Sequence, residues 1–195
     1  METDPYASPP AIGTSMCCVR VLFGLPGEGP RSEQFSATGH GMHREGFVVE
    51  FSPNGRPLWV GNFQPGLSGY NSVLPHPDGT SLIVIAGGQA YVIDPKERRQ
   101  LGIFGGGIEV ALDVPTMSLL VLGNGIWLEA WDRSGIRWRS RRISWDGMSN
   151  LRVEHDKLIG EAWSPIDDCD YPFEVDVATG VVKGGSYNGP PDSFA

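Results

Sequence analysis

Long hydrophobic runs are missing from this 195-residue chain. No stretch reaches the roughly 18 consecutive apolar residues that a membrane-spanning helix needs, so the sequence argues against a helical membrane protein. The first residues, METDPYASPP, are acidic at the start and lack the apolar segment of a secretory signal. We therefore expect a cytoplasmic protein that does not bind a membrane.

Positive charge and cysteine are also scarce. The chain has 15 lysines and arginines against 23 acidic residues, a formal net charge of −8. Such a surface is unsuited to displacing the counterions of a phosphate backbone, so we expect no nucleic-acid partner. The three cysteines, Cys17, Cys18 and Cys169, are too few and too unevenly spaced for a disulfide framework. Reduced thiols and a cytoplasmic location follow.

Helical periodicity is nearly absent, and short apolar or alternating runs bounded by Gly, Pro, Asn and Asp take its place. Twenty-seven glycines and 16 prolines are typical of many strands joined by tight turns. The sequence therefore predicts an all-β chain. The clearest predicted strands are Val19–Phe23, Phe47–Phe51, Leu58–Asn62, Leu82–Ala86, Ala90–Asp94, Leu101–Phe104, Ile108–Val114, Leu119–Leu122, Ile126–Trp131, Ile136–Arg142, Lys157–Trp163, Phe173–Val177 and Val181–Gly184.

These strands repeat. The stretches VVEFSPNGRPLWVG, AYVIDPKERRQLGIF, LEAWDRSGIRWRS and FEVDVATGVVKGG each contain an apolar strand, a polar turn and a second strand. Upstream of the last three, TSLIVIAGG, MSLLVLGNG and DKLIGEAWS also correspond. The aspartates of the aligned turns, Asp94, Asp132 and Asp176, lie 38 and 44 residues apart. A period of about 40 residues with about four strands per repeat is typical of propeller blades.

The stretch SVLPHPDGTSLIVIAGGQAYVIDPKERRQL resembles a blade of the WD-repeat and quinoprotein-like β-propellers. Pro77-Asp78-Gly79 stands where such a blade turns from its first to its second strand, and Ile93-Asp94-Pro95 stands at the turn from its third to its fourth. The likeness concerns the repeat alone, because the Gly-His and Trp-Asp motifs of true WD repeats do not recur in register. It implies four four-stranded antiparallel repeats that form a small or partial propeller. An open meander sheet or a β-sandwich is the alternative.

Three segments are expected along the chain. Residues 1–15 have the Pro, Ser and Ala content of a disordered leader, residues 16–188 form a single all-β domain, and residues 189–195 form a C-terminal tail. If the sheet is open, its bare edge predicts a homo-oligomer, since a symmetry mate then covers the edge.

Two loops resemble catalytic motifs only in part. GLPGEGPRS at 24–32 has the glycine spacing of a phosphate loop, but Pro30 stands where the lysine belongs. GLSGY at 66–70 lacks the glycine two residues after Ser68 that a nucleophile elbow needs. In FEVDVATGVV at 173–182 we expect Asp176 to accept hydrogen bonds from its own turn and Gly180 to adopt a positive φ.

A metal site is the first candidate for chemistry. His40 and His43 in HGMH make half of such a site, and the acidic loop SPIDDCDYP supplies Asp167, Asp168 and Asp170. This loop lengthens the last repeat and is therefore predicted to be an insertion. The calcium-loop motif is missing, so a solvated acidic loop is the simpler interpretation.

An arginine-rich stretch, DRSGIRWRSRRISWDG at 132–147, is the second candidate. On a strand Arg137, Arg139 and Arg141 would project from one face, opposite Trp138 and Ser140. One interpretation is an outer strand whose charges prevent edge-to-edge pairing. The other is a surface that recognises acidic groups on a protein partner, with Trp145 and Trp163 beside it at loops.

The function that this sequence favours is a non-enzymatic module that docks a protein partner through an Arg/Trp surface. An immunity or inhibitor protein that neutralises a toxin is a special case. A metal- or His-dependent hydrolase or lyase built on the loops is the alternative of another class. The sequence predicts no cofactor.

Overall fold

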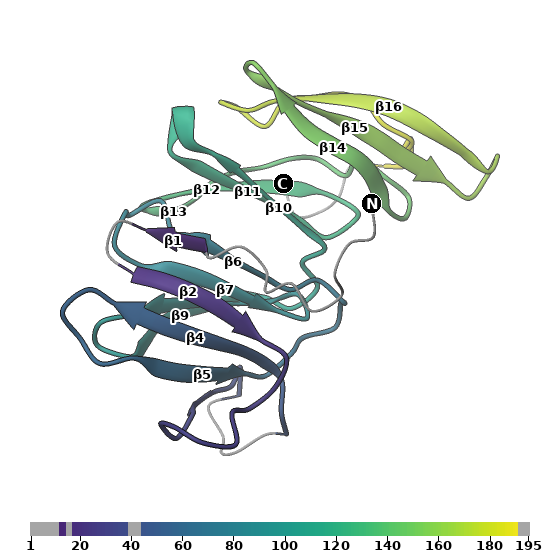
Figure 1. The fold of residues 1–195 in the computed structure, drawn as a ribbon. Helices are drawn as coiled ribbons and strands as arrows, with labels where there is room; N and C mark the ends of the chain where they lie inside the picture. The colour runs from purple at the N-terminus through teal and green to yellow at the C-terminus, as the bar shows by residue number, and fades with distance from the viewer. Residues whose placement is uncertain (1–11, 15–16, 39–43, 191–195) are drawn as a thin grey trace, which may run out of the picture. The chain divides into compact units, whose positions relative to one another are not determined.

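The computed structural model describes residues 12–14, 17–38 and 44–190. The chain divides into two compact units, Met1–Gly107 and Ile108–Ala195. Each unit contains two β-sheets (Figure 1). The prediction of one domain over residues 16–188 stays a prediction.

The first unit contains a five-stranded and a four-stranded sheet. The first sheet has the order β1-β2-β4-β5-β3, with β3 parallel to β5 and all other pairs antiparallel. Its strands are β1 (Ile12–Thr14), β2 (Cys17–Leu22), β3 (Glu33–Phe35), β4 (Phe47–Pro53) and β5 (Trp59–Phe63). The second sheet is an antiparallel meander of β6 (Ser72–Pro75), β7 (Leu82–Ala86), β8 (Gln89–Asp94) and β9 (Arg99–Gly105).

The second unit contains two antiparallel meanders. The third sheet consists of β10 (Val110–Val114), β11 (Leu119–Gly123), β12 (Leu128–Asp132) and β13 (Gly135–Arg139), with a short 3-10 turn η1 (Pro115–Met117) after β10. The fourth sheet consists of β14 (Met148–Glu154), β15 (Lys157–Ser164), β16 (Cys169–Asp176) and β17 (Val182–Gly184).

The all-β prediction is therefore confirmed, and the chain forms four sheets that are antiparallel except for the β3–β5 pair. None of the four sheets closes into a barrel, and the arrangement is consistent with a partial propeller or with open sheets. The first sheet departs from the four-strand expectation, because β3 adds a fifth strand at the edge beside β5. The strand β1 lies inside the segment that the composition predicts to be a leader, and residues 1–11 and 15–16 lie outside the described residues.

The sequence alignment of the repeats also holds in three dimensions. The four quoted stretches are the β4–β5, β8–β9, β12–β13 and β16–β17 hairpins, which are the third and fourth strands of successive sheets. Asp94 Oδ1 accepts the Lys96 N–H at 2.9 Å, and Asp132 Oδ1 accepts the Ser134 N–H at 2.7 Å. Asp176 Oδ1 accepts the Thr179 N–H at 2.9 Å, and Gly180 has φ +75°, so both expectations for that turn are confirmed.

One aromatic cluster joins the two sheets of the first unit. Trp59 on β5 is 1% exposed and stacks on Phe51, with ring centroids 4.1 Å apart. Its indole Nε1 donates to Pro95 O at 2.9 Å, immediately after the turn aspartate Asp94 of the second sheet. Tyr91 of β8 packs against the same cluster and donates its hydroxyl to Gln64 O at 2.7 Å. Burial raises the pKa of Tyr91 to about 12.

The second unit repeats this link. Trp138 on β13 lies in the core shared by the third and fourth sheets, and its Nε1 donates to Val177 O at 2.8 Å. Val177 follows Asp176 as Pro95 follows Asp94. A tryptophan on the fourth strand of one sheet thus bonds the backbone after the third strand of the next sheet, once in each unit.

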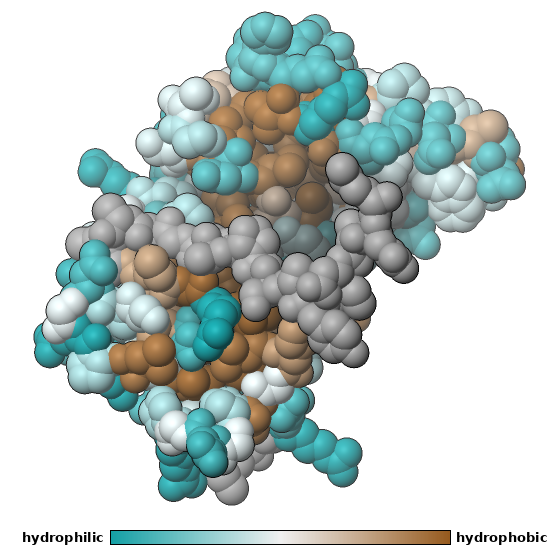
Figure 2. Space-filling model, in the orientation of Figure 1, coloured by the Kyte–Doolittle hydropathy of each residue, from teal (hydrophilic) through white to brown (hydrophobic). Residues whose placement is uncertain are grey.

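The fourth sheet has one polar face, unlike the central strands of the second and third sheets. Strands β7 and β11 are buried along their whole length, as strands with apolar residues on both faces are. Along β15 the burial alternates, so that Leu158 and Ala162 are buried while Lys157, Ile159 and Glu161 are not. Figure 2 shows that hydrophobic residues gather within each unit and that hydrophilic residues surround them.

The three cysteines form no disulfide with one another. Cys17 is buried, Cys18 and Cys169 are exposed, and all three are free thiols. Burial raises the pKa of the Cys17 thiol to about 11. No helix in the described part of the chain is long and apolar enough to cross a membrane.

Candidate functional site

The arginine-rich stretch, residues 132–147, contains the outer strand of the third sheet, β13. Strand β13 is the edge strand of the order β10-β11-β12-β13. Arg137, Arg139 and Arg141 are exposed while Trp138 and Ser140 are buried, as strand alternation predicts. The strand ends at Arg139 rather than at the predicted Arg142. Arg137, Arg139 and Arg141 are called the arginine strip below.

Two of these arginines are held by acidic residues of the neighbouring strand. The register sets Glu129 of β12 opposite Arg139, and Arg139 Nη2 lies 2.9 Å from Glu129 Oε2. Arg137 Nη1 lies 3.7 Å from Asp132 Oδ2. The arginine side chains remain about half exposed, at 46% and 56%. Exposed ion pairs contribute only about 0–1 kcal/mol, so a partner's carboxylates can replace these contacts at little cost.

Arg141 and Arg142 bind backbone carbonyls after the strand has ended. Arg141 Nη2 donates to Gly184 O at 2.7 Å, which connects this segment to the end of β17. Arg142 donates from Nε to Ser144 O at 3.0 Å and from Nη2 to Trp145 O at 2.8 Å. Both guanidinium groups therefore fix the 140–147 connection between the third and fourth sheets.

Arg142 also stacks on two aromatic rings. Its Cζ lies 5.4 Å from the ring centroid of Trp145 and 4.4 Å from that of Tyr187. The two rings meet edge to face, with centroids 4.7 Å apart at 66°. The buried Trp145 Nε1 has no hydrogen-bond partner among the described residues. We call Arg141, Arg142, Trp145 and Tyr187 the Arg/Trp cluster.

Tyr187 is the member of this cluster that the sequence did not reveal. It stands 42 residues from Trp145, in the segment after β17. Its N–H donates to Ile143 O at 3.1 Å, so the chain after β17 runs beside the 140–147 connection. A Cβ at Gly185 would lie 2.6 Å from Ile143 O, which explains the glycine at this close approach.

Trp163 is tied to the same segment through its backbone. Its carbonyl accepts the Ser144 hydroxyl at 3.1 Å and the Ser186 hydroxyl at 2.7 Å, and its N–H donates to Gly147 O at 3.2 Å. Its indole Nε1 donates to Asp168 Oδ1 at 3.4 Å. Trp163 thus lies beside the 144–147 segment that contains Trp145.

The acidic loop beyond Trp163 is the tip of an extended hairpin. β15 and β16 have eight residues each and pair along their full length, whereas β7 and β8 have five and six. The four residues 165–168 connect them. The extra length of the last repeat therefore consists of paired strand as well as loop, which corrects the expectation of a simple loop insertion.

The carboxylates of this hairpin bind neighbouring side chains. Asp167 accepts the Tyr171 hydroxyl, and hydrogen bonds from Ser164 and Tyr171 lower its pKa from 3.8. Asp168 accepts from Trp163, and Asp170 lies on β16. Within residues 12–14, 17–38 and 44–190, no three His, Cys, Asp or Glu side chains gather into a metal-binding group. The other half of the predicted metal site, His40 and His43, lies outside the described residues.

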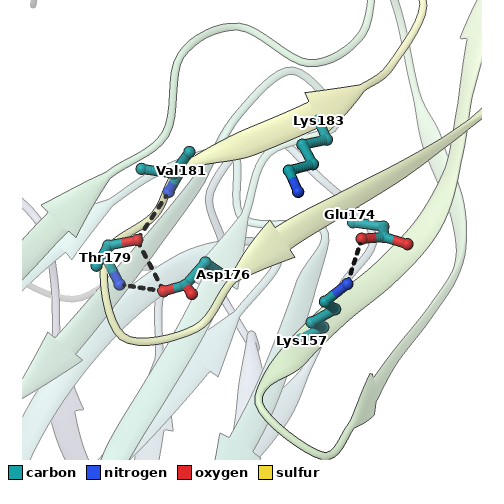
Figure 3. A pocket seen from close by; sticks show the side chains of 6 residues that line it. All are labelled: Lys157, Glu174, Asp176, Thr179, Val181 and Lys183. Atoms are coloured by element: carbon teal, nitrogen blue, oxygen red, sulfur yellow. Dashed lines mark hydrogen bonds and ion pairs between the residues drawn. The ribbon is translucent and has the colours of Figure 1, made fainter.

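A shallow hollow of about 280 Å³ opens on the polar face of the fourth sheet. Figure 3 shows the six side chains that line it: Lys157, Glu174, Asp176, Thr179, Val181 and Lys183. Lys157 Nζ lies 2.7 Å from Glu174 Oε2, and the Thr179 hydroxyl donates to Asp176 Oδ1 at 2.7 Å. Two lysines face two carboxylates, so the hollow has no net charge with which to select an ion of either sign.

Asp176 makes the stability of the turn beside this hollow depend on pH. The hydrogen bond from the Thr179 hydroxyl, supported by backbone N–H groups of Thr179 and Ala178, lowers the pKa of Asp176 from 3.8. A carboxyl whose pKa is lower in the folded state stabilises the fold above pH 3.8, and this stabilisation is lost as the pH falls through the folded value. Below about pH 4, we expect the Tm of Asp176→Asn to fall less than the Tm of the wild-type chain. Thermal unfolding followed by circular dichroism between about pH 2 and pH 6 measures it.

The control for this prediction is Asp113→Asn, a change at an exposed aspartate of β10 that closes no turn. Asparagine keeps an Oδ1 acceptor at position 176, so the turn itself is retained. A Tm that falls equally with pH in wild type and Asp176→Asn contradicts the assignment.

Comparisons with known proteins leave the chain without a family. No family model and no curated protein sequence matches it. Among solved structures, 72% of the chain is similar to a protein described as "Crystal structure of the eukaryotic initiation factor", with 9% identity and a TM-score of 0.42. The match covers 40% of that protein, so the chain spans less than half of it. A likeness of this size supports neither a family nor an activity, and the sheets remain consistent with blade-like repeats.

Proposed function

We propose that this chain is a non-enzymatic binding module that docks an acidic protein surface through the arginine strip and the Arg/Trp cluster. The single observation that carries the proposal is the exposure of Arg137 and Arg139, which form surface ion pairs with Asp132 and Glu129, beside a fixed aromatic cluster in the second unit. Both features belong to the second unit, so the proposal requires nothing of the first.

The charge of the strip supports an acidic partner. Between residues 129 and 146 the chain has five arginines against three acidic residues, although its net charge is −8. A positive patch on an acidic protein attracts an acidic surface locally while the rest of the molecule repels it. Arginine suits this role because its planar guanidinium contacts a carboxylate through two hydrogen bonds.

The aromatic cluster supports a protein rather than a small ion as the partner. Tryptophan, tyrosine and arginine dominate the residues that contribute most to protein–protein binding. Trp145, Tyr187 and Arg142 are held in place by ring contacts and carbonyl hydrogen bonds before any partner binds. A cluster that is already ordered loses less conformational entropy on binding.

A toxin-neutralising immunity or inhibitor protein is one form of the same proposal, with the toxin as the acidic partner. The His-dependent hydrolase alternative gains no support from the described carboxylates Asp167, Asp168 and Asp170, which bind Tyr171 and Trp163 or lie on β16.

Charge reversal tests the proposal. Arg139→Glu combined with Arg141→Glu is expected to lower the recovery of the partner at least about tenfold, because each change places a carboxylate against an acidic surface. The measurement is affinity capture from the native lysate with quantitative mass spectrometry, using the tagged full chain. Equal recovery by wild type and variant contradicts the proposal.

Two further variants separate binding from folding. Arg137→Glu with Arg139→Glu leaves the Arg141 contact with Gly184 intact and should lower recovery as well. Arg20→Glu with Arg56→Glu makes the same change of charge in the first unit, at exposed arginines paired with Glu50 and Glu97, and should leave recovery unchanged.

A further inference from the structure

Strand β13 ends the third sheet with an open edge. Among the strands of the described residues it pairs with β12 alone, in the order β10-β11-β12-β13. The backbone groups on the other side of β13 therefore have no strand beside them. Such an edge can take up a further strand, and its side chains decide which strand fits.

The pairing of β12 with β13 determines which backbone groups face that edge. The Ser140 N–H donates to Leu128 O of β12 at 2.8 Å. Backbone direction alternates along an antiparallel strand, so Trp138 also faces β12, whereas Arg139 directs its N–H and C=O to the open edge. The 2.9 Å distance from Arg139 Nη2 to Glu129 Oε2 agrees, because side chains approach most closely at pairs that exchange no backbone hydrogen bonds. An antiparallel strand added at this edge would exchange both of its bonds with Arg139.

The arginine strip lies along the same edge. The side chains of Arg139 and Arg141 leave one face of an extended chain about 7 Å apart, and Arg137 stands at the bulge before them. Within the described residues, Arg139 donates only through Nε and Nη2, to Glu129 Oε2. Its Nη1 therefore remains for a carboxylate from outside. A residue directly opposite Arg139 on an added strand would have its Cβ about 5 Å from that of Arg139, within reach of the guanidinium group.

The charges of the strip select among strands. A second copy of β13 would set arginine against arginine, and like charges directly opposite one another destabilise a strand pair. A strand with an acidic residue at every second position instead places one carboxylate at Arg139 and the next at Arg137 or Arg141. The other edge of the same sheet, β10, carries the exposed Asp113 and would repel such a strand. An acidic strand therefore fits this sheet at β13.

We propose that the acidic partner binds as an extended segment that adds an antiparallel strand to the third sheet at β13, with aspartate or glutamate at alternate positions facing the arginine strip. This inference rests on the proposed function, because it names the form of the ligand at the same arginines. Backbone hydrogen bonds to the edge supply affinity, and the alternate carboxylates supply specificity. The arginines that keep like strands away from the edge are thus the groups that admit an acidic strand.

Synthetic peptides test the inference. The probe is a heptapeptide, blocked at both ends, in which threonine and glutamate alternate so that three glutamates share one face. Titration into the isotope-labelled full chain, followed by NMR, is expected to shift the backbone amide of Arg139. A peptide of the same composition with its three glutamates adjacent turns one of them to the other face. It should therefore bind roughly three- to tenfold more weakly.

Two N-methylated forms of the alternating peptide separate strand pairing from simple attraction of charge. N-methylation of the central glutamate removes the N–H that would donate to Arg139 O, and should raise the Kd at least about tenfold. N-methylation of the threonine that follows changes an N–H that points away from β13, and should leave the Kd within about twofold. Both peptides keep all three carboxylates, so charge alone cannot distinguish them.

Variants of the chain complete the test. Arg139→Glu should abolish binding of the alternating peptide, while Arg20→Glu combined with Arg56→Glu, in the first unit, should leave it unchanged. The inference is overturned if the form methylated at the central glutamate is not the weaker ligand, or if no peptide shifts the β13 amides at millimolar concentration. If lysate capture still depends on Arg139 and Arg141 in that case, the proposed function stands and its partner does not bind as a strand.

Discussion

Trp59→Ala is expected to lower the free energy of unfolding of the first unit by about 3–5 kcal/mol, the range for removing a buried tryptophan. The indole is 1% exposed, stacks on Phe51 and donates to Pro95 O across the two sheets. The change therefore leaves a cavity and an unpaired carbonyl together. Urea denaturation followed by circular dichroism measures the loss.

The matched control is Trp127→Ala, in the other unit. Trp127 is only partly buried, and the guanidinium of Arg139 lies 5.8 Å from its ring centroid. We expect a much smaller loss there, about 1 kcal/mol. A loss for Trp59→Ala as small as the loss expected for Trp127→Ala would contradict the assignment of the Trp59 indole as the link between the sheets.

Trp138→Ala is expected to have an equally large effect on the second unit, about 3–5 kcal/mol. The side chain is 8% exposed, and its Nε1 donates to Val177 O at 2.8 Å. The packing is close, because a Cβ at Gly180 would lie 2.7 Å from the Trp138 ring. Hydrogen–deuterium exchange should show faster amide exchange in β13 and β16, and denaturation gives the size of the loss.

Trp138→Phe separates the hydrogen bond from the packing. It keeps an aromatic ring but leaves Val177 O without its donor, so the expected loss is smaller, about 1–3 kcal/mol. A loss as large as that of the alanine variant would mean that the hydrogen bond, and not the packing of the ring, holds the third and fourth sheets together.

The local turns were predictable from the sequence, whereas the long-range contacts of Trp59 and Trp138 were not. The turns at Asp94, Asp132 and Asp176 were predictable because each aspartate bonds a backbone N–H two or three residues away. The pairing of Trp59 with Pro95 and of Trp138 with Val177 spans 36 and 39 residues. Only the repeat period relates such positions, and it does not say which atoms meet.

Among the strands absent from the predicted set, β14 was missed for a local reason. Its partly buried residues are Met148, Leu151 and Val153, and the step of three between the first two breaks the alternation that marks a strand. A register shift between Ser149 and Arg152 creates that step, and Asn150 adopts φ +54° within it. This β-bulge places extra residues of β14 opposite fewer residues of β15. It therefore disturbs the alternation by which the strand could have been predicted.

The candidate site was predictable in its residue types but not in its contacts. Alternation along β13 gave the exposure of Arg137 and Arg139 correctly. The acids that hold them, Asp132 and Glu129, follow from the hairpin register, which a bulge between Ala130 and Trp131 shifts. The contact of Arg142 with Tyr187 joins segments 45 residues apart and left no sign in the sequence.

Docking through the second unit is the central claim, and hydrogen–deuterium exchange of the chain alone and with its captured partner tests it most directly. The account predicts slower exchange in residues 137–147 and 185–187, which contain the arginine strip and the Arg/Trp cluster, and little change on the polar face of the fourth sheet around Lys157 and Glu174. Slower exchange confined to that face, or unchanged exchange in both segments while the partner is bound, would contradict it.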